Sequence, residues 1–495
     1  MTARPADLLD RVDGCCADLE QRLTPGEARD RVIALRRSLR DVLRVAVIGS
    51  VSAGKSTLVN ALLRRSVAPV GTGDTTRVVT WYRFGTHERL DVHDREGSVH
   101  TVPLTADGQV PPSIDSRPAA LDRLEVHLSN DVLRSMTLID TPGLDTLDGE
   151  GEAGVAALTG SAATATGDAR RAADVVLYAF AQARQFDQAV VERFEATAAG
   201  DGGGLNVLGV LTKADRLAPD GDDPWAQAER VAARARDELP TSVVDVVPVA
   251  AILAQAARSG GLTERHRHAL GTLAALPARD LDDALASAAE FLEWPDVDLA
   301  RSTRQELLAM LDLHGLRVGA RAARTATRMG EILAALEAEG HVDRLERVLA
   351  ARFTHRRDLL RVHAALNELE RITYLGAADR AGDALRSIRR PLEALRLDPG
   401  LHDLRILEFA RDVGPADLPP DLAEDLRRLA DRDDHAKVAD GVGPDLPAAA
   451  ARAASRWAVL ANDVSADPAL RRGAHDVKRA FELIWERHAH LRSRP

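Results

Sequence analysis

The sequence predicts an α/β domain built on a mostly parallel, doubly wound sheet, followed by an extended all-α bundle or stalk. Three observations predict this fold. An apolar, β-branched run at 44–48 leads into a glycine loop and then a helix-forming segment. Strand and helix patterns alternate from there to about residue 255. Strand patterns then disappear after about residue 262, whereas amphipathic helical stretches continue to the end.

Bulk composition limits the protein class. A chain of 495 residues can form two to four domains. The net charge of −11 and pI near 5.8 argue against a nucleic-acid partner. Cys15 and Cys16 are adjacent and cannot form a disulfide framework, which favours a reducing cytosol. The first residues do not resemble a signal peptide, and no run of about 18 apolar residues predicts a membrane span.

Residues 1–43 are predicted to form a helical arm. Apolar residues recur at helical spacing from Leu8 to Leu23. A break follows, where Thr24 is predicted as the N-cap, with Pro25 at the first helical position and Glu27 completing a capping box. A second helix should then run to about Leu43.

Residues 44–260 are predicted to form the α/β domain. Residues 124–128 and 136–140 are interpreted as a hairpin around 129–131. Apolar β-rich runs at 175–181, 207–212 and 243–249 suit buried parallel strands. Any ligand should then bind at the carboxyl ends of the strands.

Residues 261–495 are predicted to be helical throughout. Their apolar stripes need helical partners, which favours an extended bundle. The last helix is predicted at about 467–491, with Asp467 as its N-cap and Pro468 at its first position.

The loop from Gly49 to Ser56 fits the G-x-x-x-x-G-K-S pattern of a phosphate-binding loop. Gly49 and Gly54 let the backbone turn its N–H groups towards one point, and the following helix adds its positive dipole end. Lys55 can bridge the outer phosphates, and Ser56 can place its hydroxyl on Mg²⁺. The other predicted nucleotide-contacting residues of this segment are Ser50, Val51, Ser52, Ala53 and Thr57.

Lysine is rare here, which makes Lys55 more informative. The chain has four lysines, Lys55, Lys213, Lys437 and Lys478, among 65 basic residues. Drift from lysine to arginine in a GC-rich genome explains the bias. Arginine cannot replace a compact ammonium group inside a tight phosphate cradle.

A second motif, D-x-x-G, follows the predicted strand at 136–140. Asp140 can hold the Mg²⁺ shell through water, and the backbone N–H of Gly143 can reach a γ-phosphate. Loss of that contact on hydrolysis would release the segment after it, Leu144–Asp168. An ordinary strand-end turn is the alternative interpretation.

A third motif, Thr212–Lys213–Ala214–Asp215, has the form T-K-x-D and indicates guanine recognition. Asp215 can accept hydrogen bonds from N1–H and the exocyclic amine of guanine, whereas adenine has a bare acceptor at N1. The stem of Lys213 can cover the base. Ala250, in the next strand-end loop, is predicted to donate its backbone N–H to the guanine carbonyl. A chance tetrapeptide before a helix cap is the alternative.

The first switch should lie in the polar stretch Gly71–Arg77. A threonine there can ligate Mg²⁺ and contact the γ-phosphate, and Thr76 is the preferred candidate, with Thr75 as the fallback. The predicted metal ligands are therefore Ser56, Thr76 and Asp140. The predicted catalytic groups are Lys55, Ser52 and Thr76.

Together these motifs resemble the dynamin-like GTPases. The loop S-A-G-K-S-T-L-V-N-A-L-L, the threonine pair after Pro69, D-T-P-G and T-K-A-D all match, over about residues 44–255. Within the bacterial branch, the chain is similar to the actinobacterial isoniazid-inducible type in length, in composition and in the stretch Leu311–Arg317.

The resemblance implies a GTPase head on a helical stalk, with Mg²⁺ as cofactor and GTP and GDP as ligands. It implies that the N-terminal arm and the last helix meet as a hinge near the head. It also implies self-association through the heads or with a paralogous dynamin-like partner, and a cytoplasmic location, peripheral at the inner face of the plasma membrane. Val51 stands where eukaryotic dynamins have a water-orienting glutamine, so slow hydrolysis without self-association is expected, with Ser52 and Thr76 left to place the water.

Three interpretations of function follow. In the first, GTP hydrolysis is coupled to an anionic membrane, with headgroups meeting Arg386, Arg389, Arg390 and Arg396; a solvated arginine-rich face is the alternative. In the second, the protein is a GTP-dependent switch whose helical region binds a protein partner. In the third, it binds GTP without turning it over.

Overall fold

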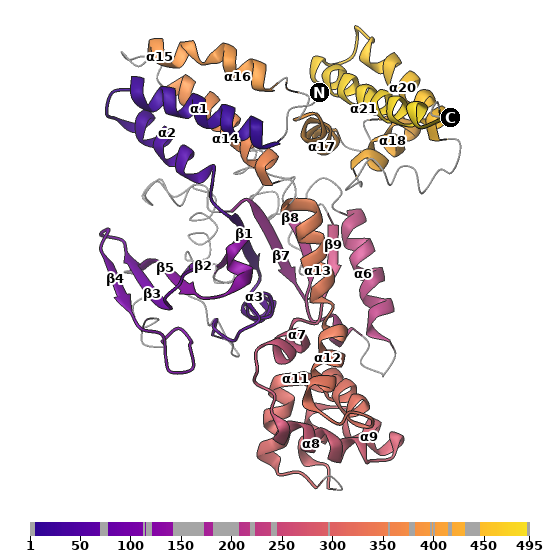
Figure 1. The fold of residues 1–495 in the computed structure, drawn as a ribbon. Helices are drawn as coiled ribbons and strands as arrows, with labels where there is room; N and C mark the ends of the chain where they lie inside the picture. Colours follow the sequence, from indigo (N-terminus) through magenta and orange to yellow (C-terminus); the bar gives the residue numbers. More distant parts are fainter. Residues whose placement is uncertain are drawn as a thin grey trace.

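The computed structural model has a central sheet, with helical parts at both ends of its strands (Figure 1). It describes residues 5–69, 78–111, 114, 121–141, 173–181, 207–217, 223–238, 245–295, 298–354, 357–375, 382–396, 398, 401–413, 418–430 and 446–492.

The sheet has nine strands among the described residues, in the order β4-β3-β5-β2-β6-β1-β7-β8-β9. Strand β1 lies between β6 and β7 and is parallel to both, and β8 and β9 continue the parallel half. The bounds are β1 (Leu43–Gly49), β2 (Thr80–Phe84), β3 (Arg89–Asp94), β4 (Val99–Val102), β5 (Leu121–Leu128), β6 (Met136–Asp140), β7 (Val175–Phe180), β8 (Val207–Leu211) and β9 (Asp245–Pro248). The mostly parallel sheet is confirmed.

The predicted hairpin between residues 124–128 and 136–140 is wrong. β2 lies between β5 and β6, parallel to the first and antiparallel to the second. The chain leaves β5 through the short 3₁₀ turn η3 (Asp131–Arg134), where the side chain of Asn130 accepts from the N–H of Val132. Local turn residues alone could not show that a third strand separates the two runs.

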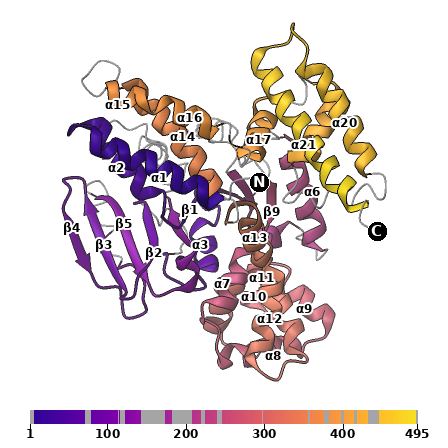
Figure 2. The same cartoon turned by 45° about the horizontal axis from the view of Figure 1, so that its top comes forward.

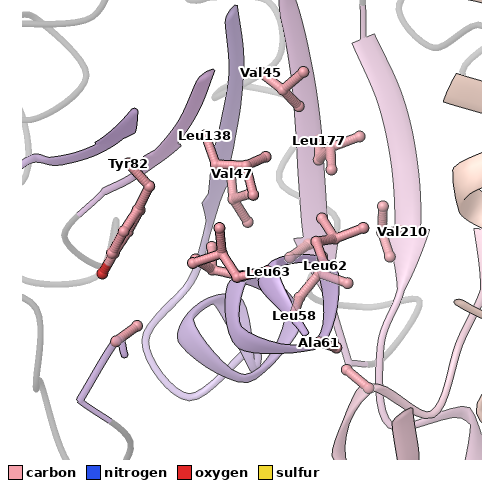
Figure 3. Close-up of a cluster of buried hydrophobic side chains, with 14 of the residues drawn as sticks. Val45, Val47, Leu58, Ala61, Leu62, Leu63, Tyr82, Leu138, Leu177 and Val210 are labelled. Carbon is pink, nitrogen blue, oxygen red and sulfur yellow. The ribbon is translucent and has the colours of Figure 1, made fainter. Parts of the chain in front are cut away.

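Each face of the parallel strands has its own apolar core, because successive side chains point to opposite faces. Val45 and Val47 pack with α3 (Lys55–Leu63), α7 (Ala251–Arg258) and α13 (Val342–Leu349), as Figure 3 shows for α3. Ala46 and Ile48 pack on the other face with α6 (Pro224–Glu238).

The α13 helix corrects the expected boundary at residue 260. Val342, Leu345 and Leu349 are buried in the same core as β1 and α3, so α13 is part of the α/β domain. The chain thus leaves the domain after α7, which ends at Arg258, and returns to it with α13 at Val342. The helix pattern alone did not show this return, because a helix covering a sheet has the same apolar stripe as one in a bundle.

The excursion forms a compact group of helices at the carboxyl edge of the sheet, called here the helical lobe (Figures 1 and 2). Its helices are α8 (Glu264–Ala274), α9 (Ala278–Ala284), α10 (Ala288–Glu293), α11 (Arg301–Ala323) and α12 (Met329–Gly340). One apolar core joins them to α7, with Leu270, Phe291 and Leu311 fully buried.

The N-terminal helices lie at the other end of the strands, opposite the helical lobe (Figure 1). α1 (Pro5–Arg22) and α2 (Glu27–Ser38) share a core with α14 (Arg357–Leu375), α15 (Gly382–Ser387) and α16 (Arg389–Arg396). The predicted capping box is wrong. Gly26 is the N-cap of α2, with φ of 156° and no side-chain cap, because the break extends one residue beyond Pro25.

The group of α1, α2, α14, α15 and α16 is called here the neck. A cluster of largely buried ionic side chains fixes it to the sheet. Asp174, directly before β7, accepts from Arg44 of β1 and from Arg361 of α14. Arg361 also donates to the backbone carbonyls of Ser38 and Val42, at 2.9 and 2.7 Å. Burial alone would raise the pKa of Asp174, but the charges of Arg44 and Arg361 outweigh it and lower this pKa below its usual value.

The C-terminal helices form a separate core. They are α17 (His402–Asp412), α18 (Pro420–Ala430), α20 (Leu446–Ala461) and α21 (Pro468–Arg492), around the fully buried Trp457. Asp467 caps α21 as expected, accepting from the N–H of Ala469 at 2.7 Å. α21 packs on α20 and α17 rather than joining the core of α1 and α2, so the expected hinge with the N-terminal arm is wrong. The apolar face of α21 packs against the apolar face of α20, so it is not available to α1 and α2.

None of the described helices is both long and apolar enough to cross a membrane.

Candidate functional site

The glycine loop lies where β1 meets α3, at the carboxyl edge of the sheet. Gly49 has φ of 151°, and a Cβ there would lie 2.1 Å from the carbonyl oxygen of Ala179 in β7. Gly54 has φ of 84° and is the N-cap of α3. Both positions therefore require glycine. At Gly49 a side chain has no room and the φ angle is unfavourable, whereas at Gly54 only the φ angle is unfavourable.

Lys55 is buried and donates to the carbonyls of Gly49 and Ser50, at 3.0 and 2.9 Å. Its ammonium group thus lies at the start of the loop. Lys55 is also the first residue of α3, so the first-turn amides of that helix come next in the sequence. A buried cation next to these amides makes a site for anionic phosphate oxygens.

Ser56 and Asp140 meet beside this loop. The hydroxyl of Ser56 donates to Asp140 Oδ2 at 3.0 Å, and Asp140 is 1% exposed at the end of β6. A hydroxyl and a carboxylate are oxygen ligands of the kind that Mg²⁺ prefers. These two residues therefore fit the predicted metal site.

The T-K-x-D segment is fastened to the same loop. Thr212 Oγ1 donates to the carbonyls of Ala53 and Phe180, at 2.5 and 3.1 Å. Lys213 adopts a left-handed conformation, with φ of 53°, and its Nζ donates to the carbonyl of Ser52 at 2.7 Å. The lysine stem thereby extends across the loop next to Gly54, as base stacking would require.

Asp215 forms the buried end of the adjacent pocket. It is 5% exposed, and neither carboxylate oxygen has a hydrogen-bond partner among the described residues. Burial raises the pKa of Asp215, and the nearby charge of Asp312 raises it further. The pocket is lined by Gly54, Thr57, Thr212, Lys213, Asp215, Arg216, Ala251, Ile252 and Asp312. A buried carboxylate with free acceptor capacity is suited to a ligand that presents two N–H donors.

Ala250 is not placed as the sequence predicts. Its backbone N–H donates to the carbonyl of Gly340 at 3.0 Å, and its side chain is fully buried. Ala251, the first residue of α7, lines the pocket instead. First-turn amides have no partner within their own helix, so the amide suited to a carbonyl ligand belongs to Ala251. Ala251 takes the role predicted for Ala250 because the end of α12 lies beside α7 and its Gly340 carbonyl occupies the Ala250 amide.

Asp312 is one of four pocket residues that sequence reasoning missed, with Arg216, Ala251 and Ile252. It lies on α11, about a hundred positions after Asp215, in a stretch noted only for its family likeness. Its backbone leaves the helical conformation, with φ of 54° and ψ of −178°, a strain of roughly 1–3 kcal/mol. No local pattern predicts that α11 folds back onto the pocket.

Several expected residues cannot be placed. Thr75, Thr76, Gly143 and the segment 144–168 lie outside the described residues. Within the loop, Val51 is half-buried and Ser52 is exposed with φ of 61°.

The chain resembles several known proteins. Residues 45–214 match the model of the Dynamin family. The isoniazid-induced protein IniC of Mycobacterium tuberculosis is 29% identical over 463 residues, covering 90% of both chains. A bacterial dynamin-like protein of Nostoc punctiforme is 31% identical over 71 residues, which are 14% of this chain and 10% of that protein.

Among solved structures, an oligomerised bacterial dynamin pair, described as a mechanism for long-range sensing and tethering of membranes, overlaps with a TM-score of 0.34. The identity is 14%, covering 100% of this chain and 77% of that chain.

The sheet and its loops define a GTPase-type phosphate-loop domain, to which helical bundles are joined. These matches support a bacterial dynamin-like GTPase, because residues 45–214 resemble the Dynamin family and 90% of the chain is similar to IniC.

Proposed function

We propose that this protein binds and hydrolyses GTP with Mg²⁺. The observation that carries the proposal is the meeting of three motifs at one edge of the sheet. Lys55, the Ser56–Asp140 pair and Asp215 come from the ends of β1, β6 and β8, and Lys213 bonds directly to the phosphate loop. A nucleotide that spans them would have phosphates at one end and guanine at the other.

Each residue has a role that follows from its chemistry. Lys55 and the first amides of α3 would hold the outer phosphates and stabilise charge that develops during transfer. Ser56 and Asp140 would hold Mg²⁺, whose charge neutralises the phosphate oxygens. Asp215 would accept from guanine N1–H and the exocyclic amine, while Ala251 would donate to its carbonyl. Thr76 and Gly143 remain proposals from the sequence alone.

Hydrolysis requires a water in line with the γ-phosphate. The side chain of Val51 cannot hydrogen-bond to water, whereas the exposed Ser52 next to it can. A low basal rate is therefore expected. The test is steady-state phosphate release from GTP and from ATP by the purified protein, with Lys55→Ala as the inactive control. Tight GTP binding without release would favour the non-hydrolysing interpretation.

We further propose that the nucleotide cycle is coupled to an anionic membrane surface, as the likeness of residues 45–214 to the Dynamin family suggests. Arg386, Arg389 and Arg390 are exposed on α15 and α16, on the neck. Arg396 does not belong to this group, because it is only partly exposed, and it donates to Asn367 and pairs with Glu370. Exposed arginines close to such a surface attract anionic headgroups.

Co-sedimentation with phosphatidylglycerol vesicles, with GDP or a non-hydrolysable GTP analogue, tests this coupling. Retention that falls in Arg389→Ala/Arg390→Ala supports it. Absence of retention in both nucleotide states would favour the alternative, a GTP-dependent switch that binds a protein partner through its helical region.

A further inference from the structure

We propose that Asp312 is a positioning residue of the base pocket, which holds the guanidinium group of Arg216 beside the bound base and so makes the helical lobe part of the nucleotide site. The proposal rests on the guanine specificity proposed above. It adds a residue from outside the three nucleotide motifs and a route by which the lobe can respond to the nucleotide.

The contact between the two side chains is direct. Arg216 follows Asp215 in the chain, and its Nε donates to Asp312 Oδ2 at 2.6 Å, with Nη2 donating to the same oxygen. Both residues line the pocket that contains Asp215. The Asp312 side chain is 17% exposed and that of Arg216 is 58% exposed, so the lobe supplies the more buried, better-fixed partner.

The backbone conformation of Asp312 is a second, independent observation in favour of a role at the pocket. A φ of 54° within an otherwise helical segment is unfavourable for a residue with a Cβ. Its Oδ1 accepts from the N–H of Leu313, which helps to hold this conformation. Strained residues of this kind persist where the surrounding structure fixes them, and they cluster at binding sites. Here the strained residue directs its carboxylate to the pocket.

The lobe is packed too closely on α7 for Asp312 to move alone. A Cβ on Gly315, one turn after Asp312, would lie 2.3 Å from Leu253 Cδ2 of α7. A Cβ on Gly340 would lie 2.9 Å from the Cβ of Ala254, also on α7. The first residue of the same helix, Ala251, lines the pocket. Base binding at Asp215 and Ala251 is therefore linked to the position of α11.

The test measures the affinity of a fluorescent GDP analogue for the wild-type chain and for Asp312→Gly, Arg216→Ala and the double variant. Glycine accepts the backbone conformation at 312 without strain, so Asp312→Gly should keep or raise the melting temperature. It should nevertheless bind GDP about fivefold or more weakly. Arg216→Ala should show a similar loss, and the double variant should lose little more than either single one, because the two residues act together.

Arg301→Ala is the matched control, since Arg301 also lies on α11 in an exposed ion pair, with Glu293 at 2.8 Å. Its GDP affinity should equal that of the wild type. A third variant, Asp312→Asn, gives a readout that a purely structural role would not move. The charged groups around Asp215 are Asp312, His314, Arg216 and Lys213. Removal of the Asp312 charge should shift the acid loss of GDP affinity to lower pH.

The outcomes separate the two proposals. A wild-type chain that binds no guanine nucleotide contradicts the proposed function. A wild-type chain that binds GDP, with Asp312→Gly unchanged, overturns the role of Asp312 alone. Weaker binding in Asp312→Gly with unchanged binding in Arg216→Ala overturns it as well, since Asp312 would then not act through Arg216.

Discussion

The hydroxyl of Ser56 donates to the carboxylate of Asp140 across 3.0 Å, although the two residues are 84 positions apart. Ser56 is the second residue of α3, and Asp140 is the last residue of β6. Parallel pairing of β1 with β6, with Val47 opposite Asp140, brings them together. This relationship is the structural basis for the proposed Mg²⁺ site.

Replacing Lys55 by Ala should weaken nucleotide binding by at least about tenfold, because it removes a charge-assisted contact to phosphate. Titration with a fluorescent GDP analogue measures this. Lys478→Ala is the matched control, since that lysine pairs with Glu482 on α21, outside the α/β domain. Equal affinity in both variants would contradict the placement of the phosphates at Lys55.

Asp215→Asn should reverse the base preference. The asparagine amide can donate to the carbonyl that xanthine carries in place of the exocyclic amine of guanine, but it loses the charged acceptor. GDP affinity should fall at least about tenfold, while affinity for xanthosine diphosphate rises. A parallel loss for both nucleotides would indicate that Asp215 supports the fold rather than reads the base.

The affinity for GDP should fall on the acid side, at a higher pH than the titration of an ordinary aspartate would give. Asp215 must be ionised to accept two hydrogen bonds, and burial, followed by the charge of Asp312, raises its pKa. Protonation therefore competes with base binding at a higher pH than for an ordinary aspartate. GDP titrations between pH 4 and 8 would show a loss on the acid side, and a flat profile would contradict the ionised role.

Gly49→Ala should destabilise the domain by at least about 2 kcal/mol, because its Cβ would meet the carbonyl of Ala179 and its φ is unfavourable. Thermal unfolding by circular dichroism measures this. Gly14→Ala in α1 is the control. Nothing lies within 4 Å of a Cβ there, and helix propensity predicts a gain of roughly 0.5–1 kcal/mol. A similar melting temperature for both variants would argue against the close approach of β7.

Arg361→Ala should lower stability by about 3–5 kcal/mol, since it removes one of the two cations that pair with Asp174 and leaves the carbonyls of Ser38 and Val42 without their donor. Arg357→Ala on the same helix, in a more exposed pair with Asp358, should cost less than about 1 kcal/mol. Because the pKa of Asp174 is lowered, its contribution is present above the unfolded-state pKa and is lost as pH falls towards the folded-state value. The difference between Arg361→Ala and wild type should therefore shrink in acid; an unchanged difference would contradict this ion cluster.

The parts predicted well from sequence are those with local patterns. The phosphate loop, the apolar strands at 175–181 and 207–212, and the cap at Asp467 depend on neighbouring residues, and the structure contains each of them. The errors concern distant contacts. β2 inserts between β5 and β6, α13 returns to the sheet, and α21 joins α20. The Ala250 amide is bonded to Gly340, 90 residues away, and Asp312 reaches the pocket through a non-helical turn. Such contacts depend on tertiary packing and leave no periodic signal in a single sequence.

The most direct test of guanine-nucleotide hydrolysis is steady-state phosphate release by the purified wild-type chain with Mg²⁺, compared between GTP and ATP at equal concentration. The predicted result is slow, continuous release from GTP, essentially none from ATP, and none from either in Lys55→Ala. Equal or faster release from ATP, or no release from GTP in the wild type, would contradict it.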